Sequence, residues 1–135
     1  MNFYEIQREL YTRCANALKD EFDKVKVLNS MSTLPAEFPC VAIVFNNSPS
    51  VRNTRTNDGN EYRDFFINVD VYTNTQNKKL DAETISAFVQ DHFCKYNFQV
   101  ESDRPVNGIN APTIYHQSTT LVATVKNDGT IYYRG

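Results

Sequence analysis

The strongest constraint on the fold is an alternation of residue types in residues 65–73. Apolar residues take every second position: Phe65, Ile67, Val69 and Val71 alternate with Phe66, Asn68, Asp70 and Tyr72. Because successive side chains of a strand point to opposite faces, this stretch predicts a strand with one apolar face and one mixed face. Such a strand is typical of a sheet that helices cover on one side only.

Two other stretches have the three- and four-residue periodicity of helices that could supply this cover. In residues 2–22 the apolar stripe consists of Phe3, Ile6, Leu10, Cys14, Ala17, Leu18 and Phe22. In residues 81–96 it consists of Ile85, Phe88, Val89, His92, Phe93 and Tyr96. Asp81 is the expected N-cap of the second helix, and Glu83 lies in its first turn, where the helix dipole favours an acid.

Five further stretches predict strands. Residues 40–45 form a short apolar run after Pro39, which favours a buried strand over a helix. Residues 25–28, 98–101, 113–125 and 130–133 are the other four, and residues 102–112 read as a polar loop. The sequence Asn127-Asp128-Gly129 predicts a hairpin turn, because these residues tolerate positive φ. Residues 40–73 predict a second hairpin with an extended tip.

The predicted element order is α-β-β-β-α-β-β-β. This is an α+β fold in which two helices pack on one face of a mainly antiparallel sheet. A chain of 135 residues fits one domain, so residues 1–135 are expected to share a single core. A chain of this length removes roughly two-thirds of its unfolded surface from water, and needs no metal or disulfide to fold.

Two polar stretches are candidate contact regions. Residues 46–60 contain one apolar residue, Val51, and predict a long mobile loop of the kind that binds partners. The predicted strand at 113–125 is polar on both faces in its middle, which suggests a subunit interface or a wet lumen. The candidate contact residues are Arg52, Arg55, Asp58, Arg63, Gln117 and Thr119. The simpler interpretation of the charged ones is solvated surface.

Composition argues against several functional classes. The net charge of −2 gives no electrostatic footprint for nucleic acid. No stretch approaches the ~18 consecutive apolar residues of a membrane helix, and the start of the chain does not resemble a signal peptide. The three cysteines are widely spaced, which indicates a reducing compartment and buried thiols. We therefore expect a soluble, intracellular protein.

The search for catalytic chemistry is largely negative. Four scattered glycines exclude a phosphate-cradling loop. His92 and His116 have no second histidine or cysteine at zinc-site spacing, so we expect His92 to be a satisfied core or interface residue and His116 to be exposed. No cofactor or metal is expected. A nucleophilic pair such as Cys40 with His116 stays an alternative that no surrounding motif supports.

The layout resembles the tail-completion or tail-terminator proteins of long-tailed bacteriophages, also described as minor capsid or neck proteins. The resemblance rests on the first helix, residues 37–43 (EFPCVAI), the polar loop, the alternating strand and the second helix. It continues in residues 113–115 (TIY) and 128–132 (DGTIY) of the last strands, and so covers nearly the whole chain. It is a resemblance of layout and transfers no binding residue.

The resemblance implies a structural subunit and not an enzyme. Such subunits form a ring, commonly of six copies, that caps the tail tube and joins it to the head-side connector. The implied partners are the chain itself, the tail tube protein and a connector or head-closure protein, while DNA passes through the lumen without being gripped. The implied location is the virion, after synthesis in the host cytoplasm.

Two alternatives remain. The first is another neck component, such as a head-closure or head–tail adaptor protein. The second, from a different class, is a small enzyme or ligand-binding domain with a cleft beneath residues 46–60, in which His116 or a cysteine would face a pocket.

Overall fold

The computed structural model describes residues 2–30, 35, 37–47, 59, 61–106 and 113–133. The fold is α+β with the predicted element order. The helices are α1 (Phe3–Glu21) and α2 (Lys78–Cys94). The strands are β1 (Lys26–Leu28), β2 (Cys40–Asn47), β3 (Tyr62–Thr73), β4 (Gln99–Pro105), β5 (Tyr115–Lys126) and β6 (Ile131–Tyr132).

The strands form one sheet in the order β1-β2-β3-β5-β4, and β6 pairs with β5. β1 is parallel to β2, and all the other neighbours are antiparallel. The β2–β3 pairing confirms the predicted hairpin over residues 40–73. The β5–β6 pairing confirms the predicted turn, where Gly129 takes a φ of 95°, a value that glycine adopts without steric cost.

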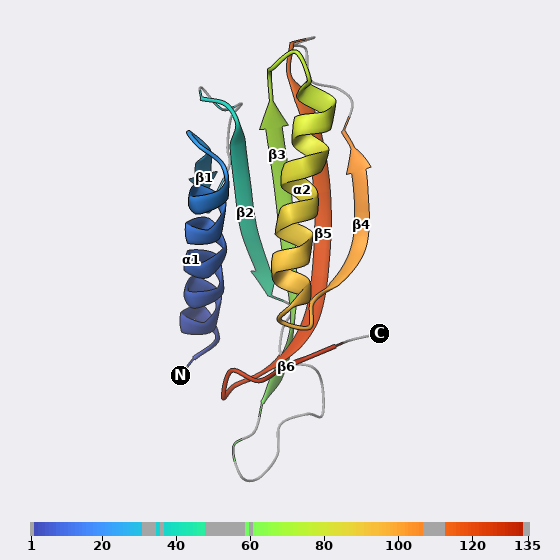
Figure 1. Cartoon of the computed structure of the whole chain (residues 1–135). Coiled ribbons are helices and arrows are strands. Elements are labelled where there is room, and N and C mark those ends of the chain that lie inside the picture. Colours follow the sequence, from blue (N-terminus) through green and yellow to red (C-terminus); the bar gives the residue numbers. More distant parts are fainter. Residues whose placement is uncertain are drawn as a thin grey trace.

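Both helices pack on the same face of the sheet (Figure 1). In Figure 1, α2 crosses in front of β3 and β5, and α1 lies beside it on the side of β1 and β2. Aromatic contacts join the layers: Phe3 of α1 meets Phe65 of β3 at 5.9 Å between ring centroids, and Phe93 of α2 meets Phe45 of β2 at 6.3 Å. The predicted stripes therefore face the sheet, as expected from their periodicity.

The alternating strand is confirmed and is longer than predicted. The odd-numbered residues Phe65, Ile67, Val69 and Val71 are fully buried beneath the helices. β3 pairs with β5 over its entire length, from Tyr62 opposite Lys126 to Thr73 opposite Tyr115. This long central pairing fixes which residues share each face, because a shift of one residue would turn the apolar set outward.

Two local predictions are wrong. Helix α2 begins one turn earlier than expected, after the N-cap Asn77, so Asp81 is not the N-cap and lies in the first turn. Residues 102–105, predicted as loop, continue strand β4. A register shift between Val100 and Ser102 marks a β-bulge, which disrupts the alternation that a sequence pattern needs.

Candidate functional site: the helix-free sheet face and its edges

The face of the sheet opposite the helices carries rows of polar side chains. Thr124 donates a hydrogen bond to Asp64 at 2.8 Å, and two rows further along Thr120 donates to Asn68 at 3.1 Å, with the apolar pair Phe66 and Val122 in the row between. Each bond links β5 to β3 across a directly paired position. Such cross-strand pairs stabilise a sheet and leave its surface polar. We call this surface the helix-free face.

Where β3 ends and β5 begins, the helix-free face brings together Asp70, Tyr72 and His116, which the sequence analysis did not connect. The His116 ring nitrogen Nε2 lies 2.8 Å from Asp70 Oδ1, and the His116 ring stacks on Tyr72 at 4.2 Å between centroids. Burial, then Asp70 and Cys40, raise the pKa of the Tyr72 phenol, which therefore stays protonated at neutral pH. This contact depends on the strand register, which places Tyr72 opposite His116 and which the sequence pattern does not reveal.

His116 is therefore not exposed as predicted, since its side chain is only 11% accessible. The geometry also separates it from Cys40. Cys40 is paired with Tyr72, and Tyr72 with His116, so two strand spacings of about 4.8 Å each lie between cysteine and histidine. Burial is the main cause that raises the pKa of the Cys40 thiol. Cys40 and His116 therefore do not form the nucleophilic pair that the sequence analysis considered.

Gln117 and Thr119 point to the other side, towards α2, and are buried with 6% and 1% exposure. Both donate to Asp103 of β4, Gln117 at 2.7 Å and Thr119 at 3.0 Å, and Gln90 of α2 donates to Thr119 at 3.3 Å. Burial alone would raise the pKa of Asp103, but hydrogen bonds from Gln117, Gln90 and Thr119 outweigh it and lower the pKa.

This network accounts within one chain for the polar middle of β5. The side chains of Gln117 and Thr119 fix the edge strand β4 to β5 beneath α2 and need no partner to satisfy them. Their role as subunit contacts stays a prediction. Ser118 and Thr120, between and beyond them, belong to the helix-free face and are half-buried.

Arg63 lies at the start of β3, on the helix side. Its guanidinium carbon is 4.7 Å from the centre of the Phe3 ring, a cation–π arrangement, and its Nη2 is 3.4 Å from Glu61 Oε1. Its Nε is buried and has no hydrogen-bond partner among the described residues. Arg52, Arg55 and Asp58, with most of the predicted loop at 46–60, lie outside the described residues.

The cysteines and His92 differ in part from expectation. Cys14 and Cys40 are buried as predicted, but Cys94 is exposed. His92 is half-buried between Phe93 and Tyr96. In the part of the chain that the structure describes, its Nε2 has no hydrogen-bond partner, so the prediction that His92 is satisfied is wrong in that respect. Burial lowers the pKa of His92, with smaller contributions from Lys95 and Arg13.

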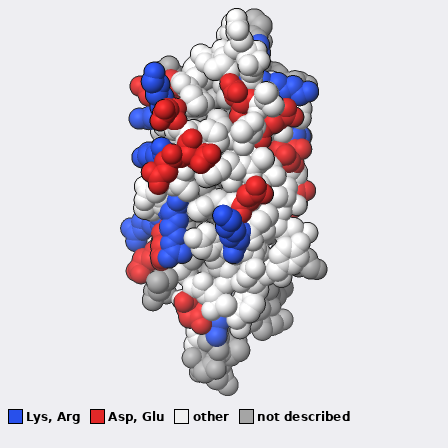
Figure 2. Space-filling view, in the orientation of Figure 1, with Lys and Arg blue, Asp and Glu red and all other residues white. Residues whose placement is uncertain are grey.

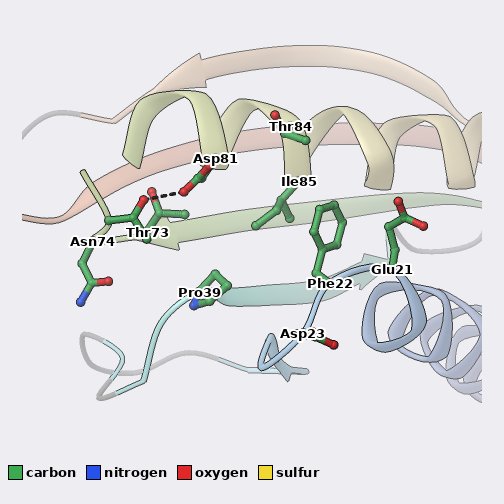
Figure 3. Close-up of a pocket in the computed structure, with 10 residues that line it drawn as sticks. Glu21, Phe22, Asp23, Pro39, Thr73, Asn74, Asp81, Thr84 and Ile85 are labelled. Carbon is green, nitrogen blue, oxygen red and sulfur yellow. Dashed lines mark hydrogen bonds between the residues drawn. The ribbon is translucent and has the colours of Figure 1, made fainter. Parts of the chain in front are cut away.

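A pocket of about 270 Å³ lies between the end of α1, the first turns of α2 and the end of β3 (Figure 3). Its polar lining includes Glu21, Asp23 and Asp81, and Thr75 donates a hydrogen bond to Asp81. The pocket lies at the end of β3, beside Thr73, whereas the alternative hypothesis placed a cleft beneath residues 46–60, most of which lie outside the described residues. Neither histidine and none of the cysteines lines it.

The helix side of the molecule carries charges of both signs (Figure 2). Over α1, basic and acidic residues intermingle, as the pair of Arg13 with Glu9 illustrates. Mixed charge of this kind does not concentrate an anionic ligand on the surface. This agrees with the interpretation of the balanced net charge.

The two edges of the sheet differ in shape. On one side, β1 pairs with β2 only at Cys40–Ala42, and a groove of about 430 Å³ follows the next part of β2. The groove is lined by Gln7, Arg8, Tyr11 and Thr12 of α1, Asn29, and Ile43, Val44 and Phe45 of β2. On the other side lies β4, whose residues 101–105 are exposed.

Comparison with known proteins assigns no family, since no family model and no curated protein matches the chain. Within the described residues, no three histidine, cysteine, aspartate or glutamate side chains gather to hold a metal ion. Neither of the two helices described is long and apolar enough to cross a membrane.

Proposed function

We propose that this chain is a structural subunit of the tail of a long-tailed bacteriophage, a tail terminator that forms a ring on the tail tube. The observation that carries the proposal is the layout of the fold. Its order of two helices and six strands is the order on which the resemblance to tail-terminator proteins rests. The role requires positioning and no catalysis.

Two of the stretches on which the resemblance rests lie in or beside strands of the sheet. Residues 37–43 lead into β2, where Cys40, Val41 and Ala42 are fully buried. Residues 128–132 form the turn into β6. The stretches on which the resemblance rests thus include two that belong to the same sheet.

The form of the sheet supports an assembly role. A sheet with helices on one face leaves a second face, here with both polar and apolar side chains, and two strand edges. Exposed backbone edges are templates for pairing with another chain. In the proposed function these surfaces contact neighbouring copies, the tail tube protein and a head-side connector. A head-closure or head–tail adaptor role is the nearest alternative within this class.

Light scattering of the purified chain, with negative-stain images of the same sample, tests the self-association. The proposal predicts closed rings of about six copies, either in solution or on the ends of tail tubes. A chain that stays monomeric and also fails to bind tail-tube ends would contradict the proposal.

A further inference from the structure

Within the described residues, β1 covers the outer edge of β2 (Cys40–Asn47) only at Cys40–Ala42. Lys26 of β1 donates a backbone hydrogen bond to the carbonyl of Pro39, so the backbone of Pro39 faces the outer edge. Because strand groups alternate with a period of two, the backbone groups of Ile43 and Phe45 face the same edge. Within the described residues, β1 ends at Leu28, opposite Ala42, and no strand pairs with this next stretch.

The groove beside α1 follows this unpaired stretch, so it has the position that an added strand would occupy. One wall is the edge of β2 and the other is α1, where the exposed Arg8 supplies a positive charge. Addition of a strand to an exposed sheet edge is a common mode of recognition, in which backbone hydrogen bonds supply affinity.

The opposite edge of the same sheet offers such a strand. The backbone N–H of Val106 donates to the carbonyl of His116, so the backbone groups of even-numbered residues near this end of β4 face β5. The backbone groups of Asp103 and Pro105 therefore face outward, away from β5. Pro105 has no N–H, which suits an outward position on an edge strand. The exposed residues of β4 include two acids, Glu101 and Asp103.

The two edges match in direction. β4 is antiparallel to β5, β5 to β3, and β3 to β2, so β4 runs antiparallel to β2. A rotation about an axis parallel to the strands leaves strand directions unchanged. It therefore brings β4 of one copy antiparallel to β2 of another.

The two edges also match in height. The register places Val44 opposite Asn68, Asn68 opposite Thr120, and Thr120 opposite Ser102. The next row runs from Ile43 to Asp103 in the same way. The unpaired stretch of β2 and the middle of β4 thus lie at the same level of the sheet.

We propose that β4 of one copy pairs antiparallel with the free stretch of β2 of a neighbouring copy, with Val44 opposite Ser102 and Ile43 opposite Asp103. The pairing ends at Asp103, because Leu28 of β1 already lies opposite Ala42, the next position along β2. The inference rests on the proposed ring and supplies its subunit contact. The pairing joins two different surfaces, and such head-to-tail contacts generate rings when the rotation closes.

Charge favours this partner over the simplest competitor. Pairing of β4 with a second β4 would bring Glu101 and Asp103 of the two copies together, whereas the groove of β2 presents Arg8 on the helix side of the sheet, the side on which Asp103 lies. Like charges across an interface disfavour a wrong partner. The bulge and Pro105 further limit unselective pairing of β4.

A disulfide trap tests the contact directly. The pair Val44→Cys with Ser102→Cys is made in a Cys94→Ser background, because Cys94 is exposed. Val44 and Ser102 fall at a position of the pairing without direct backbone bonds, where directly opposite side chains lie closest and suit a disulfide. Mild oxidation is expected to give a ladder of covalent multimers, whereas each single variant gives at most dimers.

A matched control combines Val44→Cys with Lys79→Cys, which places the second thiol at an exposed position of α2. A second pair, Val44→Cys with Arg104→Cys, tests a register in which β4 is shifted by two residues along β2. Absence of multimers beyond the control level in both edge pairs, at protein concentrations up to about 1 mM, would overturn the inference.

Charge reversal provides an independent measurement. Arg8→Glu is expected to weaken association about threefold to tenfold in light scattering. Lys19→Glu, at the other end of α1, is the control with no expected effect. Equal association of Arg8→Glu and Lys19→Glu would contradict the proposed contact.

The result is separable from the proposed function. Cross-linked multimers that do not bind tail-tube ends would support the edge pairing and contradict the tail role. Binding to tube ends without cross-links at either edge pair would support the tail role and overturn the edge pairing.

Discussion

Asp103 connects three parts of the molecule through its carboxylate. It accepts hydrogen bonds from Gln117 and Thr119 of β5, and Gln90 of α2 donates in turn to Thr119. Hydrogen bonds to a charged acceptor are stronger than those between neutral groups. The network therefore holds the edge strand in place by polar contacts, where the apolar core does not reach.

Asp103→Asn is expected to lower the free energy of unfolding at pH 7 by about 0.5–1 kcal/mol, discounted for the exposure of this edge position. The pKa of Asp103 is lowered in the folded state, so its contribution is present above the ordinary carboxyl pKa of about 3.9 and is lost as the pH falls through the folded value.

Urea unfolding at pH 7 and at pH 3 measures both effects. The deficit of Asp103→Asn should be smaller at pH 3, and Asp20→Asn, at an exposed position of α1, should show little deficit at either pH. A deficit that grows as the pH falls would contradict the assigned role of the carboxylate.

The thiols provide a second prediction at this scale. Cys14 is buried and its pKa is raised by burial to about 12, and Cys40 is also buried, whereas Cys94 is exposed. Because the thiolate is the reactive form, a disulfide reagent at pH 8 should label Cys94 within minutes and the other two at least ~100-fold more slowly. Rapid loss of two or three thiols in the folded protein would contradict the buried positions.

Residue-scale prediction from the sequence succeeded where a residue follows the local period. Cys14 lies on the stripe of α1, and its burial follows from that spacing. Failure came where strand register decides the neighbours: His116 was expected to be exposed, but its row on the sheet brings it against Asp70 and Tyr72. No local pattern encodes that row, because it depends on residues 46 positions apart.

At the scale of elements, the start of α1 is defined by a reciprocal cap. Asn2 Oδ1 accepts a hydrogen bond from the backbone N–H of Glu5 at 2.9 Å, and Asn2 Nδ2 donates to Glu5 Oε1 at 3.0 Å. The cap satisfies a backbone donor that has no partner within the helix. It anchors the end of α1 where Phe3 packs on Phe65.

Asn2→Ala is therefore expected to lower the free energy of unfolding by about 1 kcal/mol. Asn16→Ala is the matched control, because Asn16 is exposed within α1 and alanine is the better helix former there. Chemical denaturation of the two variants measures the difference. Equal stability of the two variants would show that the cap contributes nothing.

The ends of α2 and β4 show why element boundaries were harder to predict than the elements themselves. Asp81 has the character of an N-cap, yet α2 begins at Lys78 because Thr73 and the turn after β3 support an earlier start, with the Thr73 hydroxyl donating to the carbonyl of Lys78. In β4 the bulge shifts the alternation, so its polar second half resembled a loop.

At the scale of the whole molecule, the class of fold followed from two periods. The alternation in β3 and the stripes of α1 and α2 sufficed to predict a sheet covered on one face. The order of strands in the sheet did not follow, because pairing β5 between β3 and β4 is a tertiary choice. The proposed assembly depends on the two outer edges of the sheet, at β2 and at β4, and only the strand order identifies them.

Binding to tail tubes tests the central claim most directly. Tubes assembled from the tube protein encoded in the same genome are mixed with this chain and examined by negative stain, with a label on the chain. The account predicts a ring of label at one end of the tube and none along its length. Label along the whole tube, or none at either end, would contradict a tail-terminator role.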